Sequence, residues 1–208
     1  GNITEQNDVF IMASRPNVTK TPATYWMRAS EVYFLLAEAA LHGISVNGSA
    51  EDLYRKGIAM SFEENGISAN EVDNYMNSGR TPMKYELSMW SPNVNVSEPS
   101  VTNATVKWGG SNEEKLEKIM IQKWIALYPN GQEAWSEYRR TGYPKLHKVM
   151  ANYSNGEVDS NIGIRRMRYP SNRATSDEDK QNLDKARQML RDGQDKAGTR
   201  LWWDNKNK

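Results

Sequence analysis

The chain contains no cysteine, and that absence excludes several kinds of site at once. A disulfide scaffold, a thiolate zinc site and a cysteine nucleophile all need this residue. The only histidines are His42 and His147, and neither has the local Ser and Asp arrangement of a catalytic triad. Glu38 lies one helical turn before His42, but metal sites need three or four donors, so we interpret the pair as an ion-paired helix flank. We expect no catalytic residue, no metal and no cofactor.

Long apolar runs and an excess of charge of one sign are also missing. No stretch approaches the roughly 20 apolar residues that cross a bilayer, and no signal peptide is visible. Lys and Arg number 27 against 26 Asp and Glu, which gives a formal net charge of +1. A chain so balanced has no global field that recruits polyanions. We therefore do not expect nucleic acid as a partner.

Phenylalanine is scarce, whereas the other two aromatic residues are abundant. Seven Trp and ten Tyr stand against three Phe in a chain of 208 residues. Trp and Tyr combine a large apolar face with a polar edge, which suits both wet interfaces and ligand platforms. Aromatic side chains are also common in cores, and this length is enough for one domain with a sizeable core. For each aromatic residue, packing therefore competes with ligand contact as the explanation.

The strongest helix signals lie in residues 111–146. Ser111 and Glu114 form a capping box at the start of this segment. Apolar side chains then cover more than half of the helix circumference, which is typical of a central helix with several neighbours. Pro129 ends this helix, and a second, shorter helix follows. We expect the core to be centred on three residues of this segment: Ile121, Trp124 and Trp135.

A helical hairpin is expected in residues 25–78. Its first helix spans residues 29–41, and Ser49 caps the second. Gly57, within the second helix, is best explained by a close approach of the first. A capping box from Ser68 to the glutamate three residues later predicts a further short helix. The hairpin has the form of one tetratricopeptide-like unit, although no second copy occurs.

Residues 79–110 form a long irregular stretch, GRTPMKYELSMWSPNVNVSEPSVTNATVKWGG. Three prolines and several asparagines argue against a long helix or a central strand, so only brief strand pieces are expected. A structureless loop of this length is more often functional or disordered than a mere connection. This is also the one place where aromatic side chains stand among Asn and Ser on a loop.

The remaining residues, 147–208, begin with a polar, loop-like stretch from Met150 to Ser160. Ser176 caps a mostly polar helix, and Trp202 and Trp203 are expected to dock back onto the body. The segment also holds the densest basic cluster in a nearly neutral chain. Pairing with internal carboxylates, or a face against a partner, explains this cluster better than nucleic-acid binding does. Its members are Arg165, Arg166, Arg168 and Arg173.

Several motifs, in order, resemble one known family. QKWIALYPNGQEAWSEYRRTGYP, residues 122–144, closely resembles the signature of the SusD/RagB-like outer-membrane lipoproteins of Bacteroidetes. RRMRYPSN and the later TRLWWDNK resemble the tail that closes many members. WMRASEVYFLLAEAALHG, residues 26–43, resembles the last tetratricopeptide-like segment of the family. The resemblance covers most of the chain from about Tyr25 onward.

This resemblance implies a mainly α, tetratricopeptide-like helical fold with long irregular loops and few short strands. Family members carry a signal peptide and a lipidated cysteine, which are absent here, and several further helical repeats. We therefore expect residues 1–208 to be a single domain that forms the C-terminal portion of such a protein. Its expected parts are an irregular lead-in (1–24), a helical hairpin region (25–78), a long loop (79–110), central helices (111–146) and a C-terminal tail (147–208).

The resemblance also implies a function: non-enzymatic binding of glycans or other nutrients at the outer membrane, and their delivery to a SusC-like TonB-dependent transporter. Composition and periodicity alone support only a generic helical protein–protein interaction module. A carbohydrate-active enzyme is a third class, because paired carboxylates and aromatic residues build glycosidase sites. Here, however, the acidic residues lie in helix caps and helix flanks.

In relatives, aromatic side chains on loops form a platform for sugar rings, but their positions vary, so none transfers residue by residue. Physical chemistry guides the choice instead. The C–H face of a sugar packs on an aromatic ring, while amides meet its hydroxyl groups. We predict a platform in the 79–110 loop with three rings and two amide partners: Trp90, Trp108, Tyr85, Asn93 and Asn103.

Overall fold

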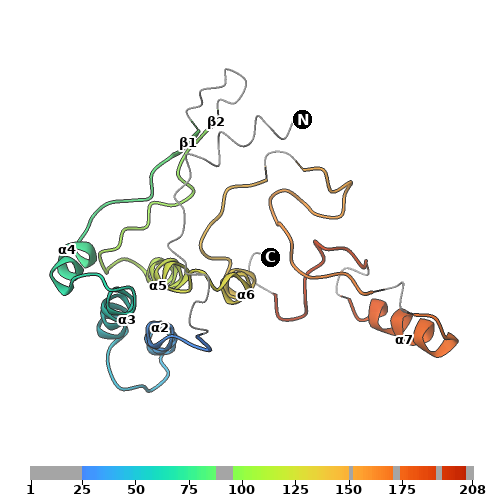
Figure 1. Ribbon diagram of the computed structural model, residues 1–208, viewed down its shortest axis with the longest axis horizontal. Helices are drawn as coiled ribbons and strands as arrows, with labels where there is room; N and C mark the ends of the chain where they lie inside the picture. The colour runs from blue at the N-terminus through green and yellow to red at the C-terminus, as the bar shows by residue number, and fades with distance from the viewer. Residues whose placement is uncertain (1–24, 88–95, 150–151, 171–173, 191–193, 205–208) are drawn as a thin grey trace.

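The computed structural model describes residues 25–87, 96–149, 152–170, 174–190 and 194–204 (Figure 1). The expected lead-in, residues 1–24, lies outside them. The elements are α2 (Ala29–Leu41), α3 (Ala50–Glu64), η1 (Ala69–Glu71), α4 (Val72–Met76), β1 (Tyr85–Leu87), β2 (Val96–Glu98), α5 (Asn112–Ala126), α6 (Gly131–Thr141) and α7 (Asp177–Gln188). The prediction of a mainly α fold with few short strands is confirmed.

Helices α2 and α3 form the expected hairpin, and a glycine sets how closely they approach. A Cβ atom added to Gly57 would lie 2.7 Å from the ring of Phe34 on α2, so the explanation of this glycine by close packing is confirmed. Ser49 caps α3 by accepting from the Asp52 amide. Ser68 accepts from the Asn70 amide, because a short 3₁₀ turn precedes α4. The predicted capping box at Ser68 is therefore replaced by a tighter turn.

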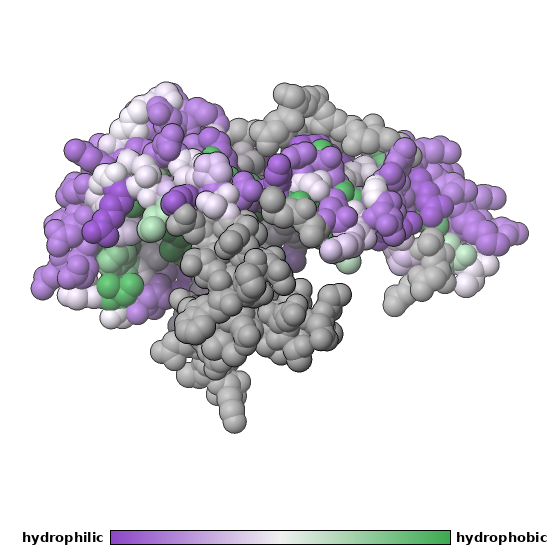
Figure 2. All heavy atoms as spheres, turned by 90° about the horizontal axis from the view of Figure 1, so that it is seen from above, coloured by the Kyte–Doolittle hydropathy of each residue, from purple (hydrophilic) through white to green (hydrophobic). Residues whose placement is uncertain are grey.

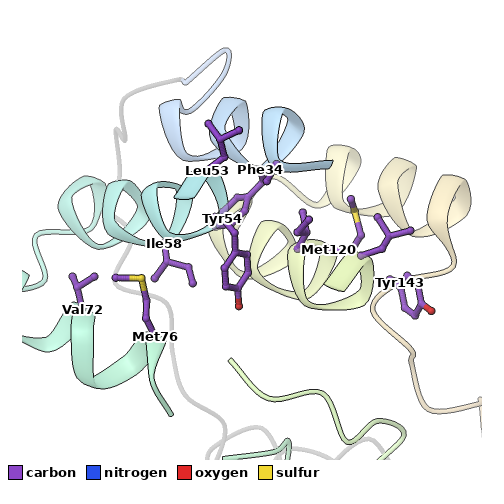
Figure 3. Close-up of a cluster of buried hydrophobic side chains, with 12 residues drawn as sticks. Phe34, Leu53, Tyr54, Ile58, Val72, Met76, Met120 and Tyr143 are labelled. Carbon is purple, nitrogen blue, oxygen red and sulfur yellow. The ribbon is translucent and has the colours of Figure 1, made fainter. Parts of the chain in front are cut away.

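The core lies where α2, α3 and α5 meet (Figure 3). The capping box of Ser111 and Glu114 starts α5 as predicted. The predicted core centre is wrong, because Ile121, Trp124 and Trp135 are only half-buried. A helix that is apolar on most sides does not show from its sequence which face packs against the neighbouring helices. On α5 the packed face holds Met120 and Lys123, each one position before a predicted core residue. The largest of the fully buried apolar side chains are Phe34, Leu53, Tyr54, Ile58, Ile119 and Met120.

A buried lysine takes one of the core-facing positions of α5. The side chain of Lys123 is 1% exposed, and its ammonium lies 3.2 Å from Glu137 of α6 and 3.9 Å from Glu31 of α2. Arg140 binds Glu137 at 2.7 Å and donates two hydrogen bonds, each 2.7 Å, to Glu38. Buried charges are tolerated when they are paired in this way. The network joins α2, α5 and α6. Glu38 is ion-paired on the flank of α2, as expected, and its main partner is Arg140.

The C-terminal segment is held by a second buried ion pair. Arg165 donates two hydrogen bonds to Asp204, which is 0% exposed, and Arg200 binds the same carboxylate at 2.8 Å. Arg139 of α6 lies 3.6 Å from the ring centroid of Trp135 and 5.0 Å from that of Trp203. These contacts attach the tail to α6. Helix α7 stands apart from the other helices (Figure 1).

The described arginines of the basic cluster pair with internal carboxylates, which was the first of the two explanations given for them. Besides Arg165, Arg166 binds Asp195 at 2.6 Å, and Arg168 lies 3.4 Å from Glu157. Arg173 lies outside the described residues. The terminal tryptophans divide their roles: Trp203 is half-buried on Arg139, whereas Trp202 is 82% exposed. Docking is thus confirmed for Trp203.

Candidate functional site

The returning half of the 79–110 loop is fixed to the helical body. Strands β1 and β2 pair antiparallel, with Tyr85 opposite Glu98, and bring the two limbs of the loop together. Beyond β2, the Thr102 hydroxyl donates to Glu117 of α5 at 2.5 Å. The Tyr54 hydroxyl donates to the carbonyl oxygen of Val106 at 2.7 Å. This half of the loop is therefore an ordered surface of the body, although it has almost no regular secondary structure.

A groove of about 210 Å³ lies between the two limbs and α5. Residues 80–82 of the outgoing limb and 104–106 of the returning limb form two of its sides. Helix α5 contributes Lys118, Ile121, Gln122 and Ile125, which share one helix face because they are three or four positions apart. Tyr75 of α4 completes the wall, and its hydroxyl donates to Gln122 Oε1 at 3.0 Å.

Lys118 links the groove to the loop. Its ammonium donates to the carbonyl oxygen of Lys107 at 2.6 Å and to the Thr105 hydroxyl at 3.2 Å. Partial burial lowers the pKa of Lys118, and the nearby carboxylate of Glu114 opposes that shift. A lysine normally titrates far above neutral pH, so Lys118 enters the groove wall as a cation.

Trp108 and Asn103 lie in different surroundings. The ring of Trp108 is half-buried, lies 5.0 Å from the ring of Tyr54 and belongs to the edge of the core, with Lys115 5.9 Å above it. Asn103 is exposed and directly precedes the groove-lining Ala104. Trp108 thus supports the base of the loop, and Asn103 is exposed to solvent.

For the other three predicted platform residues, the structure describes only the backbone of Tyr85. Tyr85 is the first residue of β1, and its side chain is not among the described parts of the chain. Trp90 and Asn93 lie outside the described residues altogether. The structure therefore places Trp108 and Asn103 and leaves the remaining three as sequence predictions.

Sequence reasoning missed the groove itself. It assigned Ile121, which lines the groove, to the core. One feature of the sequence could have predicted it. The apolar surface of α5 is wider than two neighbouring helices can cover, so part of it has to stay open. An apolar stripe left over in this way, beside polar residues of the same face, is typical of a binding surface.

The remaining chemistry of the described residues is limited. They contain no group of three or more His, Asp or Glu side chains that could hold a metal ion. Over the same ranges, no helix has both the length and the apolar character needed to cross a membrane. The face drawn in Figure 2 is mainly hydrophilic, with apolar residues in small groups. The loop and its groove are therefore the best candidate for a functional site.

Comparison with known proteins agrees with the motifs. Curated proteins gave no match, but solved structures gave strong ones. A SusD homologue from Bacteroides ovatus is 43% identical, with a TM-score of 0.79, and the match covers 86% of this chain and 37% of the homologue. A SusD homologue from Bacteroides uniformis is 39% identical, with a TM-score of 0.86, over 99% of this chain and 42% of the homologue.

A third structure is a chitin-binding SusD homologue from Flavobacterium johnsoniae. It is 42% identical, with a TM-score of 0.76, and the match covers 86% of this chain and 36% of that protein. The chain thus spans only about two fifths of the length of these relatives. The family model described as SusD and RagB outer membrane lipoprotein matches residues 1–204. The chain therefore belongs to the SusD-like family of outer membrane lipoproteins.

Proposed function

We propose that this protein binds glycans at the cell surface and passes them on without chemical change. The observation that carries the proposal is the family match over residues 1–204, together with 42% identity to a homologue that binds chitin. The aromatic content supports it, because indole and phenol rings pack on the C–H faces of sugars. Any hydrolysis of a retained glycan by the purified protein would contradict a non-enzymatic role.

The ligand platform in this proposal is the 79–110 loop, with Trp90 and Tyr85 as stacking rings and Asn93 and Asn103 as hydrogen-bonding partners. The exposure of Asn103 beside the groove supports this placement. Trp108 contributes mainly by holding the base of the loop against Tyr54.

Affinity gels that contain immobilised glycans test the platform. Trp90→Ala and Asn103→Ala should each weaken retention by about fivefold or more, because each removes one contact worth roughly 1 kcal/mol. Trp26→Ala and Asn74→Ala are matched controls, since Trp26 is 97% exposed and Asn74 is an exposed residue of α4. Unchanged retention in both loop variants, with an intact circular dichroism spectrum, would exclude the loop as the platform.

Delivery to a SusC-like TonB-dependent transporter, from a lipid-anchored position on the outer membrane, is the second part of the proposal. The description of the family as outer membrane lipoproteins supports the location. Purification of the natively expressed protein from outer membranes should recover a TonB-dependent barrel in a stoichiometric complex. Recovery from the membrane without any barrel would contradict delivery and leave glycan binding standing.

A further inference from the structure

The groove beside α5 carries charge of one sign. Two cationic residues, Arg80 and Lys118, are among the described residues that line it, and no carboxylate is. Lys107, directly after the returning limb, adds a third positive charge nearby. A concave surface with cations and no anions raises the local concentration of negatively charged ligands.

Arg80 is the cation best placed to bind a ligand. Its side chain is exposed at the start of the loop, and its backbone N–H is held by the Ser78 hydroxyl at 3.2 Å. Among the described residues, no carboxylate pairs with its guanidinium. Lys118 differs, because two acceptors from the loop already hold its ammonium. An ammonium has three donors, so one remains for a ligand. Guanidinium groups bind carboxylates through two parallel hydrogen bonds.

Apolar side chains line the groove beside these cations. Ile121 and Ile125 lie one helical turn apart on α5, and the ring of Tyr75 continues their surface. Gln122 accepts from Tyr75 through Oε1, which leaves its amide N–H groups to donate to a hydroxyl. Sites that enclose a drug-sized ligand have roughly 300–1,000 Å³. A groove of about 210 Å³ is smaller and suits one ring of a longer chain that extends beyond it.

We infer that this groove is a subsite for an acidic sugar residue, a hexuronate within a glycan chain. Its carboxylate binds Arg80 and the free donor of Lys118, and the C–H face of its ring packs on Ile121 and Ile125. A neutral hexose fits the same volume and leaves Arg80 without a partner. The inference rests on the proposed glycan-binding function and adds the chemical class of one sugar unit.

Isothermal titration calorimetry with a galacturonic acid tetramer and with its fully methyl-esterified form tests the charge requirement. The two probes share the same sugar chain and differ in the methyl groups that remove its negative charges. Hydrogen bonds to charged groups are strong enough for a preference of about tenfold or more for the acid. Arg80→Gln should remove most of that preference, because only the Lys118 donor remains, and Arg80→Lys should keep more of it. Arg168→Gln, an equal change of charge at an exposed arginine bound to Glu157, should leave it intact.

A second variant tests the apolar wall. Ile125→Ser alters an exposed side chain of α5, so the fold should persist, and affinity for both probes should fall by a similar factor. Equal affinity for acid and ester, or an Arg80→Gln variant that binds like the parent, would overturn the inference. If neither probe binds while other glycans are retained on gels, the inference fails and the proposed function stands. If no glycan of a broad panel is retained, the proposed function fails as well.

Discussion

The carboxylate of Glu64, at the end of α3, caps the first turn of α2. It accepts hydrogen bonds from the backbone N–H of Ser30 at 3.0 Å and from the Ser30 hydroxyl at 2.6 Å. Arg28, the N-cap residue of α2, makes no side-chain cap bond, and its guanidinium lies 3.7 Å from the same carboxylate. The first amides of a helix need acceptors, and negative charge is favourable there. One side chain thus joins the two ends of the hairpin.

Replacing Glu64 with Ala should lower the free energy of unfolding by about 1–2 kcal/mol, the usual cost of losing a cap. Ser30 is fully buried, so its hydroxyl would lose its acceptor with no water to replace it. Urea denaturation measures the change. Glu63→Ala is the control, because Glu63 is the exposed neighbour in the same helical turn. An equal effect of both variants would show that the cap contributes nothing specific.

Gly57→Ala should destabilise the protein, although alanine is the better helix former. The new methyl group would lie 2.7 Å from Phe34, and overpacking of this kind costs about 1–3 kcal/mol. Gly131→Ala, at the start of α6, meets nothing within 4 Å and should be nearly neutral. Thermal unfolding monitored by circular dichroism checks both. A smaller side chain at Phe34 should rescue part of the loss, and a stable single variant would contradict the close contact.

Glu137 should make the protein sensitive to acid. Burial favours its neutral form, but hydrogen bonds from Arg140 and the charge of Lys123 outweigh burial and lower its pKa below the usual 4.5. A carboxyl with a lowered folded pKa stabilises the protein above about pH 4.5, and that stability is lost as pH falls through the folded pKa. Glu137→Gln should therefore cost about 3–5 kcal/mol at pH 7 and flatten the decline between pH 5 and 3 in urea titrations.

Glu31 provides a control of opposite sign for this experiment. Burial raises its pKa, and the charge of Lys123 only partly opposes the shift. A carboxyl with a raised folded pKa favours the fold at low pH, and its contribution is lost as pH rises through that pKa. Glutamine mimics the neutral acid, so the parent should lose stability relative to Glu31→Gln as pH rises through that pKa. Parallel pH profiles for the Glu31 and Glu137 variants would contradict both assignments.

Asp204→Asn should release the C-terminal tail without unfolding the helical body. The variant leaves Arg165 buried without a carboxylate, which costs about 3 kcal/mol or more. The amides of Arg165 and Arg166 donate to the Ala197 carbonyl oxygen, so their hydrogen exchange should quicken about a hundredfold. Amides of α5 should keep their protection. Asp177→Asn is the control, since Asp177 is 93% exposed. Equal acceleration in α5 would mean that tail and body open together.

Local signals in the sequence were sufficient for the starts of α3, α5 and α7. Ser49, Ser111 and Ser176 each bind an amide three positions later, so the whole interaction lies within one turn. The core centre was not predictable in the same way. Lys123 is buried because Glu31 and Glu137 meet it from two other helices, and that meeting depends on tertiary structure.

For the candidate site, composition identified the 79–110 loop. It did not predict which side chains of the loop contact the core and which line the groove. Whether Trp108 faces a ligand or the core depends on Tyr54, more than 50 positions away in the sequence. The groove depends on which face of α5 remains uncovered, which only the packing decides. Asp204 gave no signal at all, because its partner Arg165 is 39 positions away.

The signature segment, residues 122–144, uses its distinctive side chains for internal contacts. Lys123 binds Glu137, and Arg139 stacks on Trp135. Similarity at these positions therefore reports a shared scaffold. Relatives that carry the same signature need not share a ligand, and under the proposed function their specificities would differ at the positions equivalent to Arg80, Asn103 and Lys118.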